Sequence, residues 1–107
     1  MQFNEIRKEL EGVVFDNLRI DSHNYFEAVV VNNELVKLAA FLERFFGSPA
    51  WPSKNRLLPQ VQEIIKDFGG IRPGQTIYFW SQGKDTVFAM LWPWEDKYHT
   101  TVKIIRK

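Results

Sequence analysis

The sequence predicts a single α+β domain over residues 1–107, with an antiparallel sheet of about five strands and helices packed mainly on one face. Two observations carry this prediction. Apolar residues recur with a helical spacing in three segments and with β-like patterning in five others. Neighbouring β-prone segments are joined by short polar turns, so they pair antiparallel, and the expected order is α-β-β-α-α-β-β-β.

The N-terminal segment predicts a short helix followed by a hairpin. Residues 4–11 form the helix, with Phe3, Ile6 and Leu10 on one face and Gly12 at its end. Because the helix is short, it must be stabilised by packing on the rest of the domain. Val13–Ile20 and Tyr25–Val31 are then two strands joined by a turn, Asp21-Ser22-His23-Asn24, whose side chains favour turns.

A longer helix is predicted from Asn32 or Asn33 to Phe46. An asparagine side chain is expected to cap its first turn, and Gly47 ends it. Its apolar stripe is wide, so we expect cover on more than one side. The residues of the stripe are Leu35, Val36, Leu38, Ala39, Ala40, Phe41, Leu42, Phe45 and Phe46.

A connector, Ser48-Pro49-Ala50-Trp51-Pro52-Ser53, separates this helix from the next. Pro52 restrains Trp51 to an extended conformation, so the loop presents an indole. This next helix begins near Pro59 and continues to Phe68, where Gly69-Gly70 end it.

Three strands complete the chain. The turn Arg72-Pro73-Gly74-Gln75 leads into residues 76–81, and residues 86–92 and 98–106 follow. A two-residue turn at Gly83-Lys84 places Phe79 opposite Phe88 and Ile77 opposite Met90. For the last hairpin we expect a three-residue connection, Glu95-Asp96-Lys97, which places Val102 opposite Met90 and Ile104 opposite Phe88.

This register predicts one apolar sheet face for the helices and a second face that mixes aromatic and polar groups. Such a mixture is typical of a recognition surface. The alternative is that the long helix or Trp51 covers these side chains, which would make them ordinary core. The predicted interaction surface consists of Tyr78, Trp80, Leu91, His99, Thr101 and Lys103.

A second candidate site is an aromatic pocket. Trp51, Trp92, Trp94 and His99, with nearby prolines, could form rigid walls for a flat ligand or a peptide. The alternative is that these large side chains close the end of the core, as a small domain requires.

Composition and motifs argue against other functions. The net charge of +1 is too small for a nucleic-acid footprint, and we expect no nucleic-acid partner. No apolar run is long enough to cross a membrane, and no secretory signal is visible, so the expected location is cytoplasmic. With no cysteine and two separated histidines, we expect no metal and no cofactor. Asp21-Ser22-His23 has the residue types of a hydrolytic triad, but adjacent turn residues do not form its geometry.

These features favour a non-catalytic interaction domain that self-associates or binds a protein partner through its second sheet face. If the domain self-associates, a homodimer is the expected form, because two-fold dimers dominate among soluble oligomers. The alternative function is a small-molecule-binding protein, or an enzyme, that uses the Trp/His pocket.

Overall fold

The computed structural model describes residues 3–52, 59–70 and 74–107. Arg72 and Pro73 of the predicted turn at residues 72–75, and Ser53 of the connector, therefore lie outside the described residues. The elements are α1 (Phe3–Glu9), η1 (Leu10–Gly12), β1 (Asn17–Asp21), β2 (Tyr25–Val31), α2 (Asn32–Phe46), α3 (Pro59–Ile65), η2 (Lys66–Phe68), β3 (Thr76–Gln82), β4 (Asp85–Pro93) and β5 (His99–Arg106). Their order confirms the predicted α-β-β-α-α-β-β-β arrangement.

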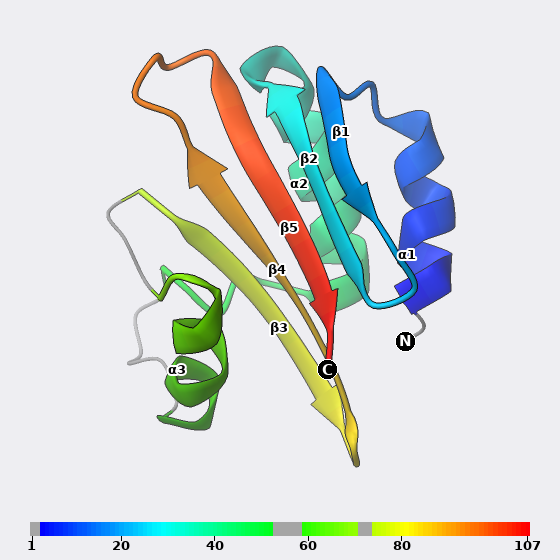
Figure 1. Ribbon diagram of the computed structural model, residues 1–107, viewed down its shortest axis with the longest axis vertical. Helices are drawn as coiled ribbons and strands as arrows, with labels where there is room; N and C mark the ends of the chain where they lie inside the picture. Colours follow the sequence, from blue (N-terminus) through cyan, green and yellow to red (C-terminus); the bar gives the residue numbers. More distant parts are fainter. Residues whose placement is uncertain (1–2, 53–58, 71–73) are drawn as a thin grey trace.

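The five strands form one antiparallel sheet in the order β1-β2-β5-β4-β3 (Figure 1). β5 lies between β2 and β4 and joins the N-terminal hairpin to the C-terminal strands. Val102 shows this position directly, because its Cα partners are Ala28 on one side and Leu91 on the other. The outer edge of β3 is partly covered by a bridge between Trp51 and Ile77.

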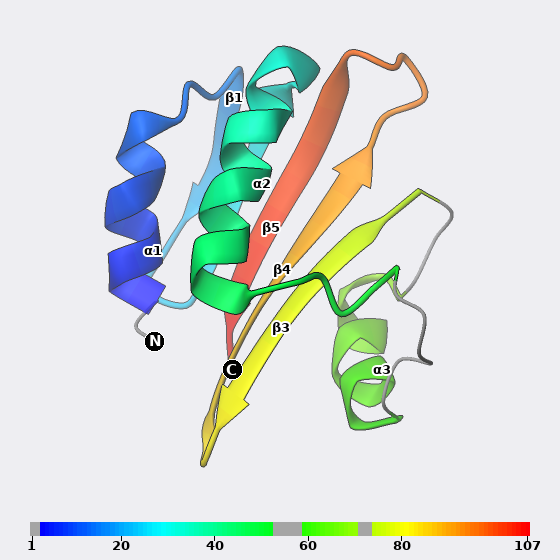
Figure 2. The ribbon, with the colours of Figure 1, turned by 180° about the vertical axis from the view of Figure 1, so that it is seen from behind.

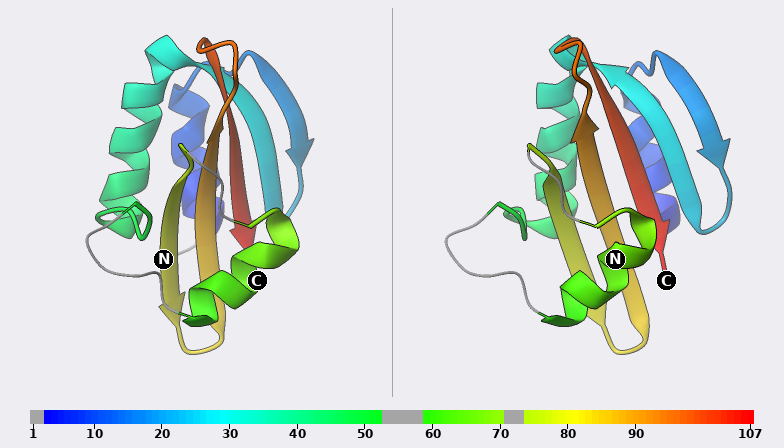
Figure 3. Two further views of the ribbon diagram at one scale, coloured as in Figure 1. Left: turned by 90° about the vertical axis from the view of Figure 1, so that its left-hand side faces the viewer. Right: turned by 60° about the vertical axis from the view of Figure 1, so that its left-hand side comes forward.

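Helices lie on both faces of the sheet, and most of the helical residues lie on one. α1 and α2 pack side by side on the face seen in Figure 2, which we call the α2 face. The small side chains of Ala28 and Ala89 are fully buried in the core beneath these helices. α3 packs on the opposite side, the α3 face, and the left view of Figure 3, turned by 90° from Figure 1, shows the sheet between the helices.

The predicted register of the β3–β4 hairpin is confirmed. Ile77 pairs with Met90 and Phe79 with Phe88, and Gly83 takes a positive φ of 61° in the turn. These four side chains lie on the α3 face, where Val61 and Ile65 of α3 pack in the same apolar cluster.

The predicted register of the β4–β5 hairpin is wrong by one residue. Met90 pairs with Lys103 and Phe88 with Ile105, so Val102 and Ile104 lie on the α2 face. The backbone N–H of Trp94 donates to the carbonyl of His99 at 2.9 Å, which leaves a four-residue loop that includes Tyr98. Because side chains alternate between faces, one extra loop residue moves every β5 side chain to the other face.

The predicted cap of the long helix is also wrong. The N-cap of α2 is Val31, without a side-chain hydrogen bond. The Asn32 amide instead donates to the Lys97 carbonyl at 2.9 Å and accepts from the Thr100 hydroxyl at 2.8 Å. Asn32 therefore ties α2 to the β4–β5 loop.

α2 is buried along one side. Leu38 and Leu42 are fully buried against the sheet, whereas Val36 is 79% exposed. Phe41 lies close to Gly12, so the neighbouring turn η1 flanks the helix. The outward side of α2 is exposed to solvent. The additional cover that its wide apolar stripe predicted is limited to the flank that faces η1.

Gly69 allows the end of α3 to approach the sheet closely. Its φ is 107°, and a Cβ atom there would lie 2.6 Å from the ring of Trp92. Gly70 also has a positive φ, 69°, but a Cβ at that position would meet nothing within 4 Å. Both glycines thus have a backbone conformation that side chains disfavour, but only Gly69 also lacks the space for a Cβ atom.

We expect Gly69→Ala to destabilise the protein more than Gly70→Ala. A side chain at positive φ costs about 1–2 kcal/mol at either position. Only Gly69→Ala adds a clash, typically about 1–3 kcal/mol for an overpacked site. Urea unfolding of both variants measures the difference, and equal losses would contradict the packing of Trp92 on Gly69.

Candidate functional site

The six residues of the predicted interaction surface do not share one face. Tyr78 and Leu91 are 2% and 5% exposed in the core beneath α1 and α2, and Trp80 is half-buried against the same cluster. The β3–β4 pairing places these three side chains on the α2 face. The β4–β5 loop, one residue longer than predicted, places His99, Thr101 and Lys103 on the α3 face. The expectation of a continuous surface is therefore wrong, and the alternative of ordinary core is confirmed for Tyr78 and Leu91.

Burial of Tyr78 has an electrostatic consequence. Loss of hydration raises the pKa of its phenol, and the negative charge of Glu43 on α2 raises it further. The ring packs 5.9 Å from that of Phe46, measured between centroids. Tyr78 is thus a neutral core residue of the α2 face and is not accessible to a partner.

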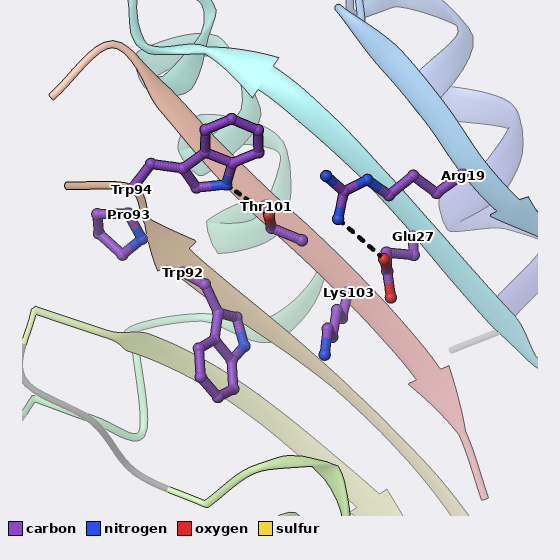
Figure 4. A pocket seen from close by; sticks show the side chains of 7 residues that line it. All are labelled: Arg19, Glu27, Trp92, Pro93, Trp94, Thr101 and Lys103. Atoms are coloured by element: carbon purple, nitrogen blue, oxygen red, sulfur yellow. Dashed lines mark hydrogen bonds and ion pairs between the residues drawn. The ribbon is translucent and has the colours of Figure 1, made fainter. Parts of the chain in front are cut away.

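The α3 face is covered by α3 over one half of the sheet only. Beside that half lies an open cavity of about 280 Å³, which Figure 4 shows from close by. Side chains from four strands meet there, with β4 on one side, β5 in the middle and β2 and β1 on the other. The cavity is lined by Arg19, Glu27, Trp92, Pro93, Trp94, Thr101 and Lys103.

The β4 side of the cavity is an aromatic wall. The Trp94 indole N–H donates to the Thr101 hydroxyl at 2.8 Å, which fixes the orientation of the ring, and the residue is 37% exposed. The His99 ring lies 4.9 Å from it, between centroids. Trp92 is partly buried, and its ring rests on Gly69. Both indoles are thus held in place by the domain before any ligand binds.

The other side of the cavity carries charge. One Glu27 oxygen accepts from the Tyr25 hydroxyl at 2.8 Å, and the other lies 3.5 Å from the Arg19 guanidinium. The guanidinium lies 5.7 Å from the Trp94 ring centroid, and the Lys103 ammonium lies 5.1 Å from that of Trp92. Both cations therefore contact the aromatic wall by cation–π interactions.

Burial and Glu27 act together on Tyr25. Loss of hydration raises the pKa of the phenol, and the hydrogen bond to Glu27 and the carboxylate's charge raise it further. The phenol therefore stays protonated and acts as a fixed donor. This contact orients the Glu27 side chain, which is only 14% exposed.

The loop that carries Trp94 is held by Asp96. One carboxylate oxygen accepts from the backbone N–H groups of Tyr98 and His99, at 2.8 and 3.1 Å. The other lies 2.5 Å from Nδ1 of His99, whose Nε2 is 3.6 Å from Asp16. The backbone hydrogen bond from Tyr98, followed by the contact with His99, lowers the pKa of Asp96. Lys97 takes a φ of 65°, which completes the turn.

The predicted aromatic pocket corresponds to this cavity in part. Trp92 and Trp94 line it, and the His99 ring packs against that of Trp94 without lining the cavity. Trp51 does not, because its backbone bridges Ile77 at the β3 edge and its ring packs in the core beneath α3.

Two charged residues of the cavity were not foreseen from the sequence. Arg19 lies where the β1–β2 register shifts between Leu18 and Ile20, an irregularity that a strand pattern does not reveal. Glu27 had a visible signal, since it interrupts an apolar strand between Phe26 and Ala28. Together with Lys103 in β5 it marks the part of the sheet that faces solvent.

The other candidate features carry no comparable site. Within residues 3–52, 59–70 and 74–107, no group of three or more His, Asp or Glu side chains is placed to hold a metal ion. The Ser22 hydroxyl hydrogen-bonds to Asn24 and to the Tyr25 backbone within its own turn. This arrangement is that of a turn and not of a triad.

A second cavity, of about 390 Å³, lies between α1 and β1. Three charged residues line it: Arg7 and Asp21 form an ion pair with each other, and Glu11 is exposed. The Arg7 guanidinium also lies 4.7 Å from the Phe26 ring centroid. The charges of Arg7 and Asp21 are therefore satisfied within the domain.

Comparison with known proteins gave no match. No family model matches the chain, and neither a curated protein nor a solved structure is significantly similar to it. In the part of the chain that is described, no helix combines the length and apolar character needed to cross a membrane. The function must therefore be argued from the cavity itself.

We expect the charge of Asp96 to stabilise the fold at neutral pH and to lose this effect in acid. Because folding lowers the pKa of this carboxyl, its contribution is complete above the unfolded value of about 3.8 and disappears as the pH falls through the folded value. The difference in unfolding free energy between the protein and Asp96→Asn, measured with urea, should be complete at pH 7 and should shrink as the pH falls below 3.8. A constant difference across this range would contradict the assignment.

Proposed function

We propose that this protein is a non-catalytic binding domain and that the cavity between Trp92, Trp94 and Arg19 receives a small, flat ligand. The observation that carries the proposal is the meeting of two oriented indoles and two cations at one open cavity. Small-molecule sites commonly combine aromatic walls with a few fixed polar groups.

The size of the cavity favours a small ligand. At about 280 Å³ it lies just below the range typical of small-molecule pockets, roughly 300–1,000 Å³. The Trp94 ring is partly exposed, and covering it with a flat ring would remove apolar area from water. An aromatic ring stacked on an indole adds roughly 0.5–1.5 kcal/mol beyond that burial.

The polar groups support binding and not catalysis. Glu27 already accepts from Tyr25 and pairs with Arg19, so its lone pairs are directed towards fixed donors. A general base has to reach the proton that it removes, and a carboxylate held in this way is poorly placed to do so. The Thr101 hydroxyl accepts from Trp94 and serves to orient the ring.

The proposal is tested by the four tryptophan indole N–H resonances in a ¹H–¹⁵N correlation spectrum. Titration with 1-naphthamide and 1-naphthoate should shift the signals of Trp92 and Trp94, which line the cavity. The signals of Trp51 and Trp80 lie in other parts of the domain and should stay in place. Phenylalanine variants of each tryptophan assign the four signals.

We expect Trp94→Ala to weaken binding of the better of these two probes about tenfold, because it removes the exposed stacking surface (1.4 kcal/mol per factor of ten). Trp80→Phe is the matched control, because Trp80 packs on the α2 face, and its affinity should equal that of the unchanged protein. Equal weakening by both variants, or no shift of Trp92 and Trp94, would contradict the proposal.

A further inference from the structure

We propose that the cavity selects planar aromatic ligands that carry one acidic group, a carboxylate or a phosphate, and that Lys103 is the anion-binding residue. This inference rests on the proposed function, because it concerns the ligand of the same cavity. It follows from how the three charged side chains of the cavity are paired.

Glu27 is the cross-strand neighbour of Lys103. The two residues are direct Cα partners in the β2–β5 pairing and lie on the same face of the sheet. Oppositely charged residues at such positions normally pair with each other. Here the carboxylate binds the Tyr25 hydroxyl and Arg19 instead, and among the described residues no carboxylate lies within 4 Å of the Lys103 ammonium.

Lys103 turns towards the aromatic wall in place of this ion pair. Its ammonium lies 5.1 Å from the Trp92 ring centroid, on the cavity side of the sheet, as Figure 4 shows. An ammonium has three donors, and contact with a ring face leaves donors free to bind an anion. Lys103 is therefore already oriented at the edge of the position that a ligand ring would occupy.

Arg19 has a different role. Its guanidinium is held between the Glu27 carboxylate at 3.5 Å and the Trp94 ring at 5.7 Å. It closes the cavity opposite Trp92, and its charge is offset by Glu27. The two cations and one carboxylate that line the cavity leave a net charge of +1, from Arg19, Lys103 and Glu27.

A carboxylate on the ligand would balance this excess, and a phosphate, with a charge of about −1.5 to −2 at pH 7, would more than balance it. A ring stacked on the Trp94 indole with its acidic group towards Lys103 would use both features at once. A cationic ligand would place its charge beside two cations, which is unfavourable in a partly enclosed site. A neutral ring would stack equally well but would leave the ammonium without an anion.

The test compares ligands that share a ring and differ in charge. Affinities of 1-naphthoate, 1-naphthyl phosphate and neutral 1-naphthamide are measured by the Trp94 indole N–H shift. We expect at least one of the two anions to bind about tenfold more tightly than the amide, since hydrogen bonds to charged groups are the stronger ones. The two anions separate a carboxylate preference from a phosphate preference.

Three variants assign the preference to its residue. Lys103→Gln should reduce the anion-to-amide ratio to within about threefold, and Lys103→Arg should restore the ratio. Lys84→Gln is the matched control, because Lys84 is exposed in the distant β3–β4 turn, and its ratio should not change. Circular dichroism melts establish that each variant is folded.

The outcomes separate this inference from the proposed function. If the amide and both anions bind equally, the cavity binds flat rings, but the charge preference and the role of Lys103 are overturned. If Lys103→Gln and Lys84→Gln lower the ratio alike, the preference comes from overall charge and the inference is also overturned. If no probe shifts Trp92 or Trp94 at millimolar concentration, the proposed function fails, and the inference fails with it.

Discussion

The position and register of β5 determine the rest of this structure. β5 pairs with β2 and β4 at once, so its register decides which side chains of the whole sheet share a face. The four-residue loop after Trp94, fixed by Asp96 and by Lys97 at positive φ, sets that register. It directs Val102 and Ile104 into the core beneath α1 and α2, and it directs Lys103 to the opposite face.

The two faces then divide structural and functional roles. The α2 face holds most of the apolar side chains and is closed by α1 and α2, with the alanines of β2 and β4 allowing close contact. The α3 face is closed by α3 over part of its area, where Ile77, Phe88, Met90 and Ile105 are buried. The uncovered half carries Glu27 and Lys103, which are the residues that a sheet surface needs where it meets water.

The cavity is built from contacts that orient its groups before a ligand arrives. Trp94 is held by Thr101 and His99, and Trp92 by Gly69. Ordering of side chains opposes binding, so groups that are already fixed lower that entropic cost. The unusual feature is electrostatic: Glu27 pairs with Arg19 and not with its strand partner, and this leaves Lys103 directed at the aromatic wall.

Local patterns in the sequence determined the element types, their order, the antiparallel sheet and the register of the tight Gly83 turn, because each depends on neighbouring residues. Trp92 and Trp94 could likewise be named as pocket residues, since bulky aromatics near a strand end have few alternatives. The faces of β5 could not be predicted, because a single additional loop residue moves every β5 side chain to the other face of the sheet. The burial of Tyr78 could not be predicted either, because the register of β5 decides which face of the sheet is apolar. The approach of Arg19 and Glu27 to the two indoles was decided only in the tertiary structure, through a strand irregularity and through pairing between distant segments.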